Sequence, residues 1–169
     1  DWSSDVCSSD LTPSNAAVQK YLNARKVPQL LASTGASRFS DPQNAPWTIA
    51  FNPNYQSEGR IYAKYILANH PNAKIGIFYQ NDDLGRDYIA GLKSGLGDKA
   101  ASMIVAEVSY ELTDPTVDSQ IVKLKAASVD LLYDASTPKF AAQAIRKVAD
   151  LDWHPVHILD INASPVSAT

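Results

Sequence analysis

The stretch that decides the fold is AKIGIFYQNDDLGRDYIAGLKSGL, residues 73–96. Its first part, AKIGIFY (73–79), is a continuous apolar run of the kind that forms a buried β-strand. After a short polar turn, a helix is predicted at residues 83–96, because Tyr88, Leu92 and Leu96 recur at intervals of four residues, the spacing of one helix face. A buried strand followed closely by an amphipathic helix is the unit of a parallel sheet that helices cover on both faces.

The same alternation continues on both sides of this stretch. Strands are predicted at 27–33, 47–51, 102–110, 129–135 and 155–161, and helices at 12–25, 58–70, 114–128 and 138–150. The strand at 27–33, VPQLLAS, is expected to be buried, and Asp114-Pro115 is expected to cap the helix that follows it. These units are too few to close an eight-stranded barrel, so the sequence predicts an α/β fold with doubly wound parallel sheets.

The two ends of the chain break the alternation. The pattern begins on a helix with no strand before it and stops soon after a strand, which predicts a fragment of a larger fold. Residues 1–11, DWSSDVCSSDL, hold three acidic residues and no apolar periodicity, so we expect them to be disordered. They resemble a translated sequencing-adaptor read, and their deletion is expected to leave thermal stability unchanged.

Composition excludes several classes of protein. The net charge of −3 lacks the basic excess of a nucleic-acid-binding protein, so no nucleic-acid partner is expected. No apolar run approaches the ~20 residues that span a bilayer. Cys7 is the only cysteine and cannot form an internal disulfide, which leaves the redox compartment undetermined.

Polar side chains gather where the predicted strands end. These strand ends read STGAS (33–37), QNDD (80–83), DASTP (134–138) and LDINAS (159–164). Open parallel sheets bind ligands beyond the carboxyl ends of their strands. Hydroxyls and free backbone N–H groups suit a small anion or carboxylate, and an aspartate at these ends suits an ammonium group. The same residue types also commonly cap helices. For each of these residues taken alone, helix capping is therefore the alternative to ligand binding.

No catalytic motif in the sequence has the structural context that its chemistry requires. The string GLGDKA (95–100) matches G-x-G-x-x-A but follows a helix, whereas a dinucleotide fingerprint follows a strand. His70, His154 and His157 lack the spacing of a metal site. We therefore expect no enzyme activity, no metal and no cofactor.

Four segments in their order along the chain carry a family resemblance. They are VPQLLASTGASRFSDP (27–42), EGRIYAKYIL (58–67), AKIGIFYQNDDLGRDYIAGLKSGLG (73–97) and TDPTVDSQIVKLKAASVDLLYDASTPKFAAQAIRKV (113–148). Together they resemble the middle of a type I periplasmic substrate-binding protein of ABC importers, in the branch of the branched-chain amino-acid (leucine-binding-like) proteins. The resemblance implies two lobes that close on a ligand, with residues 12–52 in lobe 1, residues 53–169 in lobe 2 and a crossing near FNPN (51–54).

The resemblance also implies a set of ligand-binding residues. In lobe 1 and at the crossing they are Ser33, Thr34, Gly35, Ala36, Ser37 and Tyr55, and in lobe 2 they are Asp83, Leu84, Ser136, Thr137 and Asp160. The 33–37 loop would hold the carboxylate of the ligand, and Asp160 would hold an ammonium group. Leucine binders carry aromatic residues where this chain has Leu84 and Thr137, which favours a differently shaped ligand such as an aromatic or hydrophobic acid.

The implied function is that of a periplasmic solute receptor. It would capture a small carboxylate-bearing molecule by closure of the lobes and deliver it to an inner-membrane ABC permease. The alternative is a ligand-sensing domain of a receptor or regulator with the same fold, which sequence beyond residue 169 would distinguish.

Overall fold

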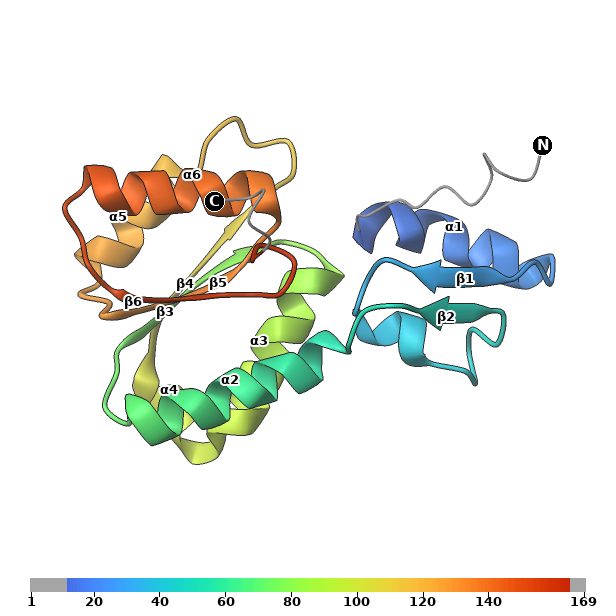
Figure 1. The fold of residues 1–169 in the computed structure, drawn as a ribbon, viewed down its shortest axis with the longest axis horizontal. Coiled ribbons are helices and arrows are strands. Elements are labelled where there is room, and N and C mark those ends of the chain that lie inside the picture. Colours follow the sequence, from blue (N-terminus) through green and yellow to red (C-terminus); the bar gives the residue numbers. More distant parts are fainter. Residues whose placement is uncertain (1–11, 165–169) are drawn as a thin grey trace.

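The computed structural model describes residues 12–164, and the predictions for residues 1–11 lie outside that range. The chain forms two units, each built on its own parallel sheet (Figure 1). The smaller unit pairs β1 (Gln29–Ala32) with β2 (Thr48–Ala50) and adds helix α1 (Thr12–Ala24) and the 3₁₀ helix η1 (Ser37–Ser40). Residues 51–54 lead from this unit into the larger one.

The larger unit is a four-stranded sheet in the order β4-β3-β5-β6, and every neighbouring pair is parallel. Its strands are β3 (Ile75–Gln80), β4 (Ile104–Tyr110), β5 (Leu131–Ala135) and β6 (Val156–Leu159). The central strands β3 and β5 are almost entirely buried, as their continuous apolar sequences predict. Because all four strands run the same way, the loops that follow them meet at one edge of the sheet.

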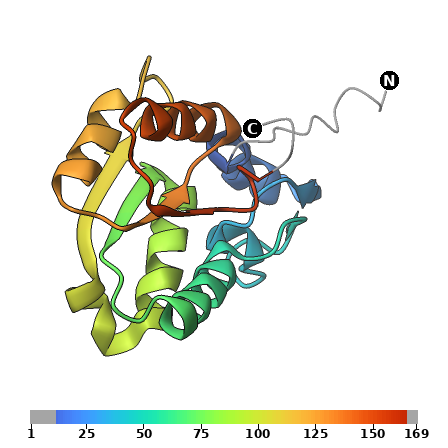
Figure 2. The ribbon, with the colours of Figure 1, turned by 60° about the vertical axis from the view of Figure 1, so that its left-hand side comes forward.

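Helices cover both faces of this sheet (Figures 1 and 2). One face carries α2 (Tyr55–Asn69), α3 (Asp83–Leu96), the short η2 (Gly97–Lys99) and α4 (Ala100–Met103). The opposite face carries α5 (Asp118–Ala126) and α6 (Pro138–Asp150). Each layer encloses a separate apolar core, and the predicted doubly wound α/β class is confirmed.

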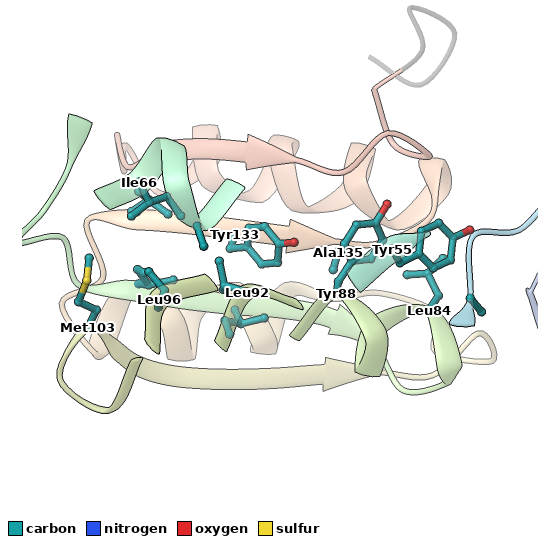
Figure 3. Packing of buried hydrophobic residues seen from close by; sticks show 14 of the residues in the cluster. Tyr55, Ile66, Leu84, Tyr88, Leu92, Leu96, Met103, Tyr133 and Ala135 are labelled. Carbon is teal, nitrogen blue, oxygen red and sulfur yellow. The ribbon is translucent and has the colours of Figure 1, made fainter. Parts of the chain in front are cut away.

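Helix α3 has the bounds that its sequence predicts. Tyr88, Leu92 and Leu96 are all buried, and Figure 3 shows them in one core with residues from α2 and β5. The helix begins at Asp83 because the Asp82 side chain accepts a hydrogen bond of 2.9 Å from the Leu84 N–H.

Glycines let α2 and α3 pack closely. A Cβ added at Gly91 would lie 2.3 Å from the Gln56 carbonyl oxygen, and one added at Gly59 would lie 2.7 Å from the Tyr88 carbonyl oxygen. No real side chain fits at such distances, so the two helix backbones approach at these two positions. This contact places the first turns of α2 beside the middle of α3.

Two sequence predictions are wrong in detail. Leu30 and Leu31, expected to be buried, are 62% and 64% exposed, because among the described residues only α1 and η1 flank the small sheet. The helix expected from Asp114 begins at Asp118. Asp114 instead closes a turn by accepting the Glu111 N–H at 2.9 Å, and Thr116 accepts the Asp118 N–H at 3.1 Å.

Candidate functional site

The candidate site lies where the loops after β3, β5 and β6 meet at the carboxyl edge of the large sheet. The 33–37 loop of the small unit packs against the same region through the start of α2. Its Gly35 carbonyl oxygen accepts the Tyr55 N–H at 2.9 Å. A Cβ on Gly35 would lie 2.0 Å from the Pro53 carbonyl oxygen, so only glycine allows this approach. The structure therefore brings the strand ends of both units together.

Within the 33–37 loop the buried residues are held by the protein itself. Thr34 is fully buried, and its hydroxyl lies 2.8 Å from the Thr12 hydroxyl and accepts the Ala36 N–H at 3.2 Å. Ala36 is also fully buried, whereas Ser33 is half-buried. Ser33 and Ser37, which is also half-buried, thus carry the hydroxyls of this loop that remain partly open.

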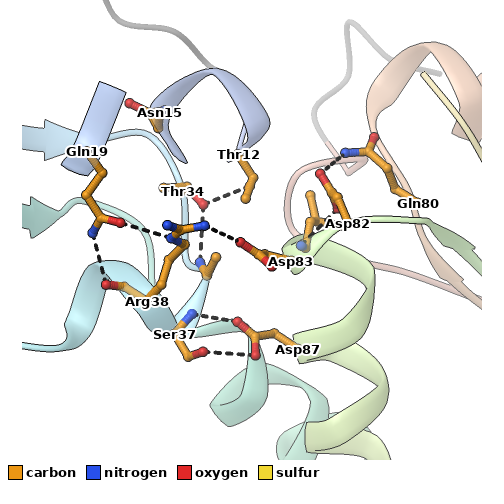
Figure 4. A network of polar contacts seen from close by, with 12 residues as sticks. Thr12, Asn15, Gln19, Thr34, Ser37, Arg38, Gln80, Asp82, Asp83 and Asp87 are labelled. Atoms are coloured by element: carbon orange, nitrogen blue, oxygen red, sulfur yellow. Dashed lines mark hydrogen bonds and ion pairs between the residues drawn. The ribbon is translucent and has the colours of Figure 1, made fainter. Parts of the chain in front are cut away.

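Ser37 contacts a carboxylate that the sequence analysis did not single out. The Asp87 side chain accepts the Ser37 N–H at 2.5 Å and the Ser37 hydroxyl at 3.0 Å (Figure 4). Next to this pair, Arg38 donates to Asp83 at 3.0 Å, in an ion pair whose two side chains are 45% and 37% exposed. Two residues expected to bind ligand, Ser37 and Asp83, therefore join the small unit to helix α3.

Leu84 and Tyr55, two more of the expected ligand-binding residues, are both buried. The Tyr55 ring stacks on Tyr88, with centroids 4.7 Å apart and an interplanar angle of 23°. The Tyr55 hydroxyl donates to Asn162 at 3.4 Å. Tyr55 thus links the start of α2 to α3 and to the loop after β6, and it presents an apolar ring between them.

The loop after β5 is tied to β4 and β3. The Thr137 N–H donates to the Tyr110 hydroxyl at 3.0 Å, and the Thr137 hydroxyl donates to Gln80 at 3.3 Å. Thr137 therefore precedes α6 without capping it through its side chain. Its neighbour Ser136 is fully buried, and its hydroxyl makes no hydrogen bond within residues 12–164.

The loop after β6 carries Asp160, which is fully buried. One of its carboxylate oxygens accepts the Ala163 N–H at 2.8 Å, while the other has no partner within residues 12–164. Burial raises the pKa of Asp160 well above its usual range, and the nearby carboxylates of Asp134 and Glu58 raise it further against the hydrogen bonds from Ala163 and Asn162.

Glu58, on the first turn of α2, holds this loop in place. Its carboxylate accepts the Tyr62 hydroxyl and the Tyr88 hydroxyl at 2.6 Å each, and the Ile161 N–H at 2.9 Å. Sequence reasoning missed Glu58 because an acidic residue in a first helical turn is ordinary. The tyrosines at 62 and 88, on separate helices, carry no signal in the sequence that they would meet on one carboxylate.

Unpaired polar atoms concentrate at this edge. Among residues 12–164, five buried side-chain atoms lack a hydrogen bond, and four of them belong to residues on or just after β5 and β6: Tyr133, Asp134, Ser136 and Asp160. An unsatisfied buried polar group costs about 1–3 kcal/mol. Such a concentration is typical of a site whose polar groups serve binding rather than folding.

A cavity of about 660 Å³ opens beside this edge, between the small unit and α3. Its lining includes Arg38 and Asp41 from the small unit and Asp83, Arg86 and Asp87 from α3. Of the expected ligand-binding residues only Ser37 and Asp83 reach it. Charges of both signs line this cavity, and Ser37 and Asp87 form part of its wall.

Two further features of residues 12–164 bear on function. They contain no group of three or more histidine, cysteine, aspartate or glutamate side chains arranged to hold a metal ion. No helix in this part of the chain has both the length and the apolar character needed to cross a membrane.

Comparison with known families assigns the class of protein. The family described as periplasmic binding protein matches residues 9–168, and the chain belongs to this family. The arrangement of its helices and parallel sheets is that of the type I fold. No match is found among curated protein sequences.

Solved structures show the same fold. A substrate-binding periplasmic protein from Ralstonia solanacearum is 26% identical, with a TM-score of 0.74 over 88% of this chain and 41% of that one. A possible leucine/isoleucine/valine-binding protein from Rhodopirellula baltica is 20% identical, with a TM-score of 0.75 over 90% and 42%. An ABC-transporter solute-binding protein from Rhodopseudomonas palustris, in complex with 3,4-dihydroxybenzoic acid, is 18% identical, with a TM-score of 0.72 over 88% and 40%. The chain thus spans about two fifths of the length of these structures.

Proposed function

We propose that this chain is part of the solute receptor of an ABC importer. It would capture a small carboxylate-bearing molecule between two lobes and pass it to an inner-membrane permease. The observation that carries the proposal is the meeting of four polar strand ends, from two separate sheets, in a member of a family of solute-binding proteins. Ligand binding shifts such a two-unit protein toward its closed form when the ligand contacts both units only there.

The proposed contacts divide between the two units. Ser33 and the backbone of Gly35 and Ala36 would receive the carboxylate of the ligand, since small residues let backbone N–H groups approach an anion closely. Tyr55 and Leu84 would contact its apolar part. This division matches ligands with one anionic end and one apolar body, such as amino acids and aromatic acids.

Asp160 would decide between these two kinds of ligand. A buried carboxylate with one unpaired oxygen favours a ligand that brings a positive charge, because an ammonium group would offset the cost of keeping that carboxylate ionised. An aromatic acid lacks that charge and would bind while Asp160 is protonated. Burial raises the pKa of Asp160, so its protonated form is more accessible than that of an exposed aspartate.

The location follows from the same proposal. Receptors of ABC importers in this family work outside the inner membrane, so the complete protein would be periplasmic. It would need no cofactor and would catalyse no reaction.

Calorimetric titration of the two-lobed protein tests the proposal. The panel should include branched-chain amino acids, benzoic and hydroxybenzoic acids, fatty acids and uncharged sugars. We expect one class of carboxylate-bearing ligand to bind. If the ligands of that class carry an ammonium group, as amino acids do, Asp160→Asn should bind them at least tenfold more weakly. Asp98→Asn, an exposed carboxylate remote from the site, is the control. Binding of sugars alone would contradict the carboxylate assignment.

A further inference from the structure

The Asp87 carboxylate is the most heavily bonded polar group between the two units. It accepts the Ser37 N–H at 2.5 Å, the Ser37 hydroxyl at 3.0 Å and the Gln56 side-chain amide at 2.7 Å. Asp87 is only 8% exposed, so its carboxylate is largely buried, and with the half-buried Ser37 it forms part of the wall of the cavity described above. Hydrogen bonds to an ionised group in such a place are stronger than neutral ones.

The two residues that donate to Asp87 come from different parts of the molecule. Ser37 belongs to the small unit and faces Asp87 on α3 (Figure 4). Gln56 lies on the first turn of α2, in the same large unit as Asp87. The close contact of α2 and α3 at Gly91 and Gly59 sets the place of the Gln56 donor. The carboxylate is therefore oriented by the large unit and bonded to the small one.

Arg38 and Asp83 form a second link between the units, but an exposed one. Ion pairs between solvent-exposed side chains contribute only about 0–1 kcal/mol. Arg38 is also held within its own unit, since its Nε donates to the Gln19 side chain at 2.9 Å. The buried Asp87 contact is thus the one expected to determine where the small unit rests.

We propose that Asp87 is a positioning residue, which fixes the 33–37 loop against the large unit through Ser37. The proposal rests on the function proposed above and refines it. Ser37 gives both of its donors to the protein's own carboxylate, so it acts on the ligand indirectly, by holding the loop that carries Ser33, Gly35 and Ala36. Loss of the Asp87 carboxylate then weakens the binding of every ligand by the same factor. The reason is that the substitution lowers the population of the assembled site, whereas Asp87 itself contacts no ligand.

A competing arrangement makes the opposite prediction. If the Asp87 carboxylate occupied the place of the ligand's own carboxylate, the ligand would have to displace it. Removing Asp87 would then tighten binding. Direct contact of Ser37 with the ligand would instead make the effect of Ser37→Ala differ between ligands.

The first test uses the 169-residue chain and requires no ligand. Amide hydrogen exchange is measured for Asp87→Ala, Asp87→Asn and the control Asp98→Ala. We expect the Ser37 amide to exchange at least tenfold faster in Asp87→Ala, less so in Asp87→Asn, which keeps one acceptor oxygen, and unchanged in the control. Exchange in the middle of α3 should stay the same. Unchanged exchange at Ser37, or equal acceleration across the whole chain, would overturn the proposal.

The second test uses the two-lobed protein and the ligands that bind it. Asp87→Ala and Ser37→Ala should each weaken the binding of all these ligands by a common factor. The double variant should bind them no more weakly than Asp87→Ala alone. Tighter binding, or a factor that changes from ligand to ligand, would contradict the positioning role. If no ligand binds at all, the proposed function fails, while the exchange experiment still decides the role of Asp87.

Discussion

At the scale of single residues, the molecule keeps acidic side chains in places where most proteins keep apolar ones. Asp134 and Asp160 are both fully buried, and each has an oxygen without a hydrogen-bond partner in the described part of the chain. Glu58 lies close enough to raise the pKa of Asp160. Like charges this close destabilise the folded state, and the ligand binding proposed above would account for their presence.

Replacing Asp160 by asparagine should stabilise the unliganded chain at neutral pH. Because the pKa of Asp160 is higher in the folded state than in the unfolded one, the folded state binds the extra proton between those two values, and stability falls as the pH rises through that interval. Each unit of pKa difference corresponds to about 1.4 kcal/mol. We expect Asp160→Asn to raise the unfolding free energy by at least ~1 kcal/mol at pH 7.

Urea denaturation between pH 4 and pH 8 checks this expectation. The difference between variant and parent should shrink toward the acidic end, because the unfolded chain also takes up the proton as the pH approaches the ordinary pKa of aspartate. A variant less stable than the parent at pH 7 would show that the charged form is favoured by the fold.

Removing Glu58 should have the opposite effect. Glu58→Ala leaves the buried Tyr88 hydroxyl without its acceptor, and an unsatisfied buried group costs about 1–3 kcal/mol. The Tyr62 hydroxyl and the Ile161 N–H also lose their bonds to Glu58, although Tyr62 keeps the Leu159 carbonyl oxygen at 3.2 Å. We expect a loss of at least ~2 kcal/mol in Glu58→Ala and less in Glu58→Gln, which retains an acceptor oxygen. Glu107→Gln, which removes an exposed ion pair with Lys93, should cost less than about 0.5 kcal/mol. Equal losses in all three variants, measured by urea denaturation, would contradict the role of Glu58.

At the scale of helices and strands, the sequence predicts best where the local pattern and the packing agree. Helix α3 has an aspartate cap, a four-residue apolar period and a buried face, and its bounds match the prediction. Helix α5 starts later than predicted because Asp114 bonds to Glu111 in a turn that competes with capping. Strand β1 has the right place but the wrong burial, since burial depends on what covers a strand and not on its own sequence.

The contact between α2 and α3 gives a prediction at this scale. Alanine favours a helix over glycine by about 1 kcal/mol, but a Cβ at Gly91 would lie 2.7 Å from the Gln56 Cα. Overpacking of this kind costs about 1–3 kcal/mol. Gly91→Ala should therefore lower the unfolding free energy, whereas Ser94→Ala, on the exposed side of the same helix, should leave it unchanged or raise it slightly. Stabilisation by Gly91→Ala in thermal melts would show that the helices can separate at little cost.

At the scale of the whole molecule, the sequence predicts the strand ends that meet but not the bonds between them. Periodicity places the 33–37 loop and α3 correctly, because each is a local pattern. It cannot reveal that Ser37 bonds to Asp87, fifty positions away, or that Tyr62 and Tyr88 share Glu58. Those contacts depend on how the two units and two helices pack, which no window of sequence contains.

The small unit gives the last prediction, because apolar side chains remain exposed on it. Tyr21, Leu30, Leu31, Ile49 and Phe51 are between 55% and 69% exposed. Exposed apolar groups gathered on one small unit promote association between molecules. We expect the 169-residue chain to self-associate as its concentration rises. Leu30→Lys or Phe51→Lys should reduce this association while leaving the circular dichroism spectrum of the chain unchanged. Ile61→Lys, at an exposed apolar position on α2 in the large unit, is the matched control and should leave association unchanged. Sedimentation velocity over a concentration series measures the effect. A chain that stays monomeric at every concentration, or one that Ile61→Lys disperses as well as Leu30→Lys does, would show that the small unit is not where the molecules meet.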